Sequence, residues 1–345
     1  MKFLKPFAVP LIATAILAVC SGCDSGSGGT LPPGGGDPDT SGTIANAAVA
    51  NETTLRSIPD SFFASARSKY RLVYTHTSHG THVSRGIFGL PGYKSGDAAR
   101  FAVSLSSAAG SLFVSDSYNS GGIPGAYPDL SQADLGDWAG WLDQNRDYLD
   151  DSANADINLV MWSWCDIAGH DVARYCALMD TLIGEYGAGG SKIGTGAGKT
   201  RVKPVTFIFM TGHGNPDANT GSGNPKEQAA YIVAHCRAKG YWCLDYYSID
   251  TTDMGGAYWE DAGDDGNSAD YVEAHDAAHP GSPSCGSFYG DWQASRAEGT
   301  DWFRSLNAPG GSAAEGEHNT QYITANRKAY AFWWLLARME GWSPS

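Results

Sequence analysis

Short apolar runs that alternate with segments of helical spacing constrain the fold of this chain more than any other feature. Runs such as Val205-Thr-Phe-Ile-Phe-Met210 are apolar on both faces, as buried parallel strands are. Strands that alternate with helices indicate βαβ units, and therefore an α/β fold with helices on both faces of a parallel sheet. Because parallel crossovers are right-handed, five runs predict a flavodoxin-like three-layer sandwich with strand order 2-1-3-4-5. The runs are Tyr70–His76, Ser111–Ser117, Ile157–Trp164, Pro204–Thr211 and Tyr241–Ile249.

The first of these runs ends abruptly at Thr77-Ser78-His79-Gly80, where small polar residues follow apolar and aromatic ones. Ligands bind at the carboxyl ends of the strands in an open α/β sheet. A serine hydroxyl at such a position needs a base to take its proton. His318 lies just before the last helical segment, and Glu315, three residues earlier, is placed to orient its imidazole. The predicted nucleophile, base and orienting acid are Ser78, His318 and Glu315.

Glycine-rich turns after several predicted strands are candidate sources of oxyanion donors, because such a hole is built from backbone amides. One glycine follows the serine, two follow the second predicted strand, and Gly212-His-Gly-Asn215 follows the fourth, where the asparagine could add a side-chain amide. The predicted oxyanion and pocket residues are Gly80, Gly121, Gly122, His79, His213 and Asn215.

This layout resembles that of the SGNH, or GDSL, hydrolase family. In that family a serine ends the first strand of a flavodoxin-like sheet, a glycine follows the second strand, and a DxxH motif precedes the last helix. Ser78 matches the serine and one glycine of the Gly121-Gly122 pair matches the glycine, whereas Glu315-Gly-Glu-His318 has glutamate in place of aspartate. The serine lies in His-Thr-Ser-His-Gly rather than Gly-Asp-Ser, and no asparagine follows the third strand. The resemblance spans roughly residues 68 to 342 and implies ester hydrolysis, including deacylation of a polysaccharide or another cell-surface ester.

Two other classes of function stay open at this point. His76, His79 and His213 are candidate ligands of a His-ligated metal-dependent hydrolase, with His170 as a further candidate. The segment of about residues 250–311, between the fifth run and His318, is acidic and aromatic, and loops of that length are usually functional. Exposed aromatic rings there would suit stacking on sugars, so the second alternative is a non-catalytic glycan-binding surface lipoprotein.

The formal net charge of −14 is spread unevenly along the chain. No Lys or Arg lies between Lys239 and Arg296, where there are eleven acidic residues. Nucleic-acid binding, which needs a basic footprint, is therefore not expected. No cofactor is predicted apart from calcium, although the spacing does not fit an EF-hand loop. The candidate calcium ligands are Asp261, Asp264, Asp265 and Asp270.

Residues 1–22 are predicted to be a secretory leader. Lys2 and Lys5 precede an apolar run, Phe7–Val19, that is too short to span a bilayer. Ser21-Gly22-Cys23 resembles a bacterial lipobox, with Cys20 where leucine is usual, so Cys23 is the predicted lipidation site. These features predict an exported, membrane-anchored lipoprotein, periplasmic or on the cell surface, that touches the membrane only through its lipid.

Residues 23–44 are rich in Gly, Pro and Ser and predict a flexible tether. Residues 45–345 then form a single α/β domain that carries the insertion at about 250–311. Five cysteines remain in an oxidising compartment, where disulfides are expected. Cys236 could pair with Cys243, and Cys165 with Cys176, although sequence alone leaves the connectivity open.

Overall fold

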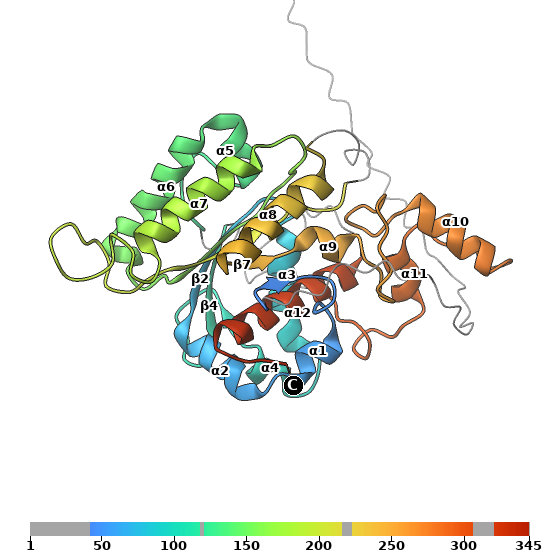
Figure 1. The fold of residues 1–345 in the computed structure, drawn as a ribbon. Coiled ribbons are helices and arrows are strands. Elements are labelled where there is room, and N and C mark those ends of the chain that lie inside the picture. Colours follow the sequence, from blue (N-terminus) through green and yellow to red (C-terminus); the bar gives the residue numbers. More distant parts are fainter. Residues whose placement is uncertain (1–41, 118–120, 216–222, 306–320, 345) are drawn as a thin grey trace, which may run out of the picture.

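The computed structural model describes residues 42–117, 121–215, 223–305 and 321–344. These residues form an α/β fold (Figure 1). Its one parallel sheet has seven strands in the order β1-β7-β6-β5-β2-β4-β3. The strands are β1 (Ile44–Ala45), β2 (Arg71–Thr75), β3 (Val103–Ser104), β4 (Leu112–Asp116), β5 (Leu159–Trp162), β6 (Thr206–Met210) and β7 (Trp242–Leu244).

The five predicted runs contain β2, β4, β5, β6 and β7, which lie in the relative order β4-β2-β5-β6-β7. This relative order is the expected 2-1-3-4-5, but the expected total of five strands is wrong because β1 and β3 extend the two edges. Each of these edge strands has two residues and pairs with one neighbour, β1 with β7 and β3 with β4. A strand of two residues carries no periodic pattern, so its pairing depends on the edge that it meets.

Helices cover both faces of the sheet and connect the strands (Figure 1). They are α1 (Glu52–Ser57), α2 (Asp60–Lys69), α3 (Thr81–Gly89), α4 (Asp97–Arg100), α5 (Leu130–Gly136), α6 (Trp138–Asp150), α7 (Val172–Tyr186), α8 (Pro225–Lys239), α9 (Tyr246–Asp250), α10 (Ala269–Ala278), α11 (Phe288–Ala294) and α12 (Tyr322–Met339), with short 3-10 turns η1 (Leu90–Gly92) and η2 (Ser152–Asn154). None of the helices in this described part of the chain has the length and apolar character needed to cross a membrane.

Neighbouring residues of each central strand point into different cores. Val73 and Val160 pack in the core under α6, α7 and α8, whereas Leu72 and Met161 pack in the core under α3 and α12. Because side chains alternate along a strand, both faces of the sheet must be apolar, as the unbroken runs predict. The sheet is therefore the middle layer of three.

Helix α12 is buried at every position from Ile323 to Ala337. It packs against α3, and the two helices approach closely at Gly86. A Cβ atom at Gly86 would lie 2.0 Å from the carbonyl oxygen of Ala325. The absence of a side chain at this position lets α12 lie under the turn that connects β2 to α3.

The described part of the insertion carries α10 and α11 and has a small core of its own. Ala262, Phe288, Tyr289, Trp302 and Ile323 form this core, and further aromatic rings pack against it. Most of the aromatic residues that the sequence places in this segment therefore hold the insertion to the domain. Tyr258, Trp259, Tyr271 and Trp292 of the insertion are only partly buried.

None of the five cysteines among the described residues is in a disulfide. The predicted pairs Cys236–Cys243 and Cys165–Cys176 are not formed. Cys176, Cys236 and Cys243 are buried in the core under α6 to α8, whereas Cys165 is half-buried at the end of β5. Cys23 and the predicted leader lie outside the described residues.

We expect Gly86→Ala to lower the free energy of unfolding by about 1–3 kcal/mol, because the added methyl group must push α12 away from α3. The matched control is Gly184→Ala in α7, where a Cβ atom meets nothing within 4 Å and alanine is the better helix former by about 0.5–1 kcal/mol. Urea unfolding of both variants measures the difference. Equal stability of Gly86→Ala and the wild type would show that α3 and α12 are not closely packed at Gly86.

Candidate functional site

Polar residues from several strands meet at the carboxyl edge of the sheet. The turn after β2 carries His76 to Gly80, and Ser163 after β5 donates its backbone N–H to the carbonyl of Thr75, 3.0 Å away. The loop after β4 joins them, since the N–H of Ile123 donates to Thr75 Oγ1 at 3.1 Å. Because the strands are parallel, their ends bring these loops to one place. The predicted location of the site is therefore where chemically reactive side chains gather.

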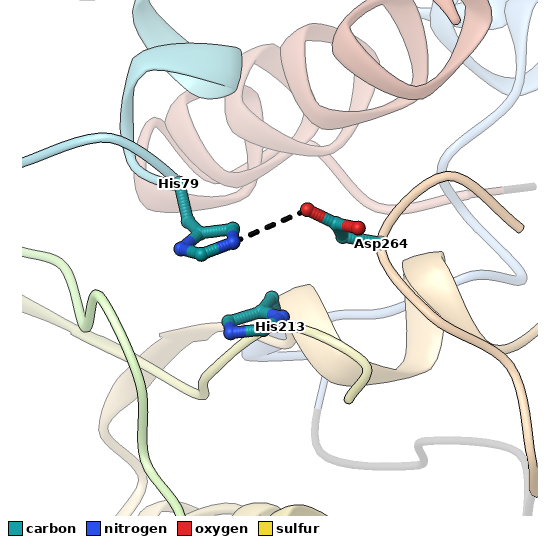
Figure 2. A group of neighbouring side chains, drawn as sticks. All are labelled: His79, His213 and Asp264. Atoms are coloured by element: carbon teal, nitrogen blue, oxygen red, sulfur yellow. Dashed lines mark ion pairs between the residues drawn. The ribbon is translucent and has the colours of Figure 1, made fainter. Parts of the chain in front are cut away.

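Ser78, Cys165, His79 and Asp264 form a chain of polar contacts at this edge. Ser78 Oγ lies 3.3 Å from Cys165 Sγ, and that sulfur lies 3.7 Å from His79 Nδ1. The other ring nitrogen, His79 Nε2, lies 3.2 Å from Asp264 Oδ2 (Figure 2). A nucleophile, a base and a residue that orients the base have this connectivity in covalent catalysis.

The electrostatics of this chain favour a thiolate beside an imidazolium. Burial opposes the charging of His79, but its contacts with Asp264 and Cys165 outweigh burial and raise its pKa to about 9. The hydrogen bond from His79 lowers the pKa of Cys165, against the opposing effect of burial. Burial of Asp264 raises its pKa, but His79 and His213 more than compensate, so the net shift is downward. The thiolate is the reactive form of cysteine, so these shifts prepare Cys165 for attack.

His213, from the loop after β6, lies face to face with His79. The two ring centroids are 3.7 Å apart and the ring planes differ by 5° (Figure 2). Burial and the charge on His79 lower the pKa of His213 to about 4, so this ring is neutral at pH 7. His213 Nδ1 lies 2.7 Å from the carbonyl oxygen of Gly214, which assigns the proton to Nδ1.

His76 belongs to a separate pair. His76 Nε2 lies 3.0 Å from Asp116 Oδ2 at the end of β4, and both side chains are buried. Its other nitrogen lies 3.0 Å from the carbonyl oxygen of Thr77. These contacts hold the turn that carries Ser78 and His79. His170, the further candidate ligand, lies 2.9 Å from Asp134.

Gly80 has a steric role at this turn. A Cβ atom there would lie 2.3 Å from Ser163 Oγ and 2.4 Å from the Cβ atom of His76. Glycine thus lets the turns after β2 and β5 touch, which brings Ser78 and His79 to Cys165. Of the other predicted oxyanion residues, Gly122 lies against Ser117 and Thr75. Gly121 donates its N–H to the Asp116 carbonyl. Asn215 lies two residues after His213 in the loop that follows β6.

The predicted partners of Ser78, His318 and Glu315, lie outside the described residues. The structure instead brings two residues to the site that were not predicted to act there. Cys165 follows a predicted strand end in Trp162-Ser-Trp-Cys165, which was a usable signal. Asp264 comes from the insertion and was considered only as a calcium ligand.

The four candidate calcium ligands have different surroundings. Asp261 accepts the backbone N–H groups of Ala269 and Asp270 at the start of α10, and Asp264 faces His79. Asp265 is half-buried and Asp270 is exposed. Among the described residues, the group with metal-ligating potential is His79, His213 and Asp264, whose donor atoms lie within 4.8 Å of one another. A calcium site formed by the four aspartates stays a prediction.

The pKa of His79 predicts a pH dependence of stability that Asp264 controls. A histidine whose pKa rises from 6.5 to about 9 on folding stabilises the fold fully below pH 6.5, and this contribution disappears as the pH rises through 9. We expect Asp264→Asn to cost about 2–3 kcal/mol of unfolding free energy near pH 6 and much less near pH 10. Urea unfolding at both pH values measures it, with the exposed Asp270→Asn as control. An equal loss at the two pH values would contradict the assignment.

Comparison of the chain with protein-family models, with curated proteins and with solved structures found no match. The chemistry of this edge of the sheet therefore carries the functional conclusion.

Proposed function

We propose that this protein is an exported acyl hydrolase that cleaves esters through a covalent intermediate at the carboxyl edge of the sheet. The observation that carries the proposal is the contact chain Cys165 Sγ, His79 Nδ1, His79 Nε2 and Asp264. Cys165 is the nucleophile in this proposal, His79 the proton shuttle and Asp264 the residue that orients and charges His79. The substrate class is the one that the resemblance to SGNH hydrolases implies, a polysaccharide or other cell-surface ester.

The proposed reaction has two steps. The Cys165 thiolate attacks the ester carbonyl carbon, and the His79 imidazolium gives its proton to the leaving alcohol oxygen, which leaves a thioester on Cys165. Neutral His79 then takes a proton from water, the hydroxide oxygen attacks the thioester, and the thiolate leaves as the carboxylic acid is released. Asp264 stabilises the imidazolium that is present at the start and the end of the cycle.

Ser78 has one of two roles in this proposal. With Cys165 as nucleophile, its hydroxyl lies close enough to donate a hydrogen bond to the thiolate, at 3.3 Å. In the alternative form, Ser78 itself attacks, with His318 as base and Glu315 as the orienting acid, as in the SGNH hydrolases. The lipid anchor on Cys23 would hold either enzyme at a membrane surface.

Variants separate the two nucleophiles. We expect Cys165→Ala and His79→Gln each to lower p-nitrophenyl acetate turnover by about 10²-fold or more, because each removes a group required for acyl transfer. Cys285→Ala is the matched control, since Cys285 is an exposed cysteine of the insertion that is in no disulfide, and it should leave turnover unchanged. Iodoacetamide labelling followed by mass spectrometry should show faster alkylation of Cys165 than of the exposed Cys285.

The opposite pattern of activity is equally informative. Full turnover by Cys165→Ala together with its loss in Ser78→Ala would assign the nucleophile to serine and reject the thiol mechanism. Absence of turnover and of labelling at Cys165 in the wild type, with Cys285 labelled, would favour the non-catalytic glycan-binding alternative.

A metal-dependent hydrolase is a second candidate, because two histidines and a carboxylate bring donor atoms within 4.8 Å of one another. Such a set is a common protein ligand set for Zn²⁺. A metal–nitrogen bond lies in the plane of an imidazole ring, whereas His79 and His213 are stacked with nearly parallel planes. One ring would have to rotate before both could bind a single ion, so the observed arrangement favours the thiol mechanism.

Chelation tests this second candidate. The thiol mechanism predicts unchanged turnover after dialysis against EDTA and less than one equivalent of zinc by elemental analysis. Loss of turnover with EDTA and its recovery with added Zn²⁺ would favour the metal-dependent enzyme. His213→Ala supplies a further test, since it removes one candidate ligand and none of the three residues to which the thiol mechanism gives a role.

A further inference from the structure

A fully buried ion pair lies beneath the candidate site. Lys328 Nζ of α12 lies 2.8 Å from Asp250 Oδ1 at the end of α9, and neither side chain is exposed to solvent. Burial raises the pKa of Asp250 and lowers that of Lys328, and the contact between the two charges opposes both shifts. Desolvating two charges costs several kcal/mol per ion, and apolar replacements of such pairs are often neutral or stabilising. Stability is therefore a weak explanation for this pair.

Asp250 connects the ion pair to His213. Asp250 Oδ2 accepts the backbone N–H of Gly214 at 3.2 Å. The carbonyl oxygen of the same glycine lies 2.7 Å from His213 Nδ1 and accepts a hydrogen bond from its N–H. Asp250 thus holds the peptide that joins His213 to Gly214, and the carbonyl of the same Gly214 sets the tautomer of His213.

Lys328 connects the ion pair to His79. Lys328 Nζ lies 3.7 Å from the centroid of the Tyr246 ring and 3.2 Å from His82 Nδ1. The Tyr246 hydroxyl donates to the carbonyl oxygen of His79 at 2.7 Å and lies 2.9 Å from the same nitrogen of His82. Because an ammonium group only donates, His82 Nδ1 acts as an acceptor toward Lys328. The ammonium group therefore contacts the ring of Tyr246, whose hydroxyl holds the His79 backbone, and the His82 imidazole beside that hydroxyl.

We propose that Lys328 is a positioning residue for the candidate site, which through Asp250 and Tyr246 fixes His213 and His79 relative to each other and to Cys165. Lys328 touches no reacting atom in this proposal. The part of this inference that concerns the reactivity of Cys165 rests on the proposed function, whereas the positions of the two histidine rings do not.

The adjacent residue in α12 supplies a matched control. Arg327 is also buried, and its guanidinium donates to backbone carbonyls, among them those of Ala50 at 3.2 Å and of Ile249 at 3.4 Å, and to the Tyr289 hydroxyl. Ile249 precedes Asp250, but among the described residues no hydrogen bond of Arg327 involves the Asp250 carboxylate, Tyr246 or either histidine. Loss of its charge should destabilise the packing of α12 and the insertion without a direct effect on His79 or His213. If the role of Lys328 were purely structural, loss of its charge would likewise lower stability without a direct effect on His79 or His213.

The experiment compares Lys328→Met with Arg327→Met in protein labelled with ¹⁵N-histidine. We expect Lys328→Met to shift the imidazole resonances of His79 and His213 and to slow alkylation of Cys165 by iodoacetamide at least tenfold at pH 7. Arg327→Met should lower the melting temperature and leave both readouts at their wild-type values. Unchanged imidazole resonances in folded Lys328→Met would overturn the proposal.

A double variant keeps the test decisive if Lys328→Met does not fold. Lys328→Met with Asp250→Leu removes both charges, which leaves no unpaired ion in the core. The expected result is a folded protein with displaced imidazole resonances, and wild-type resonances would reject the positioning role. Failure of the proposed function is seen separately, as full turnover by Cys165→Ala, and leaves the resonance comparison valid.

Discussion

The hydrogen bonding of β2 between β4 and β5 is the interaction on which the candidate site depends. Thr75, the last residue of β2, is paired in register with Trp162 of β5, and Tyr74 with Asp116 of β4. This register brings the turn after β2 between the loops that follow its two neighbours. Ser78 and His79 then meet Cys165 from one side, while the Asp116 carboxylate holds the start of the same turn through His76.

Three histidines near this edge have different charge environments although they lie close together. Asp264 and Cys165 favour the charged form of His79, whereas burial and nearby positive charge disfavour it for His213 and His82. Neighbouring groups whose pKa values are pushed apart are typical of sites that move protons. The His79 imidazolium is paired with the Asp264 carboxylate. The Lys328 ammonium group is paired with the Asp250 carboxylate.

The layering and strand order could be predicted because they follow from local patterns. Apolar runs, turn residues and right-handed crossovers act over short stretches, and they identify β2 and β4 to β7 and the edge where Ser78 lies. The edge strands β1 and β3 could not be found in this way, since two residues have no period. Glycines such as Gly80 and Gly86 are visible in the sequence, but the neighbours that exclude a side chain come from other elements.

The sequence by itself determined the α/β class, the parallel sheet and a set of reactive side chains at strand ends, because each depends on residues that are neighbours along the chain. Only the tertiary structure decided which of these side chains meet. His79 contacts Cys165, 86 positions away, and Asp264 from the insertion. Lys328 reaches His82 across 246 positions because α12 crosses α3 at a glycine. Such contacts depend on the packing of whole elements, and no local pattern records which distant carboxylate or thiol a histidine will face.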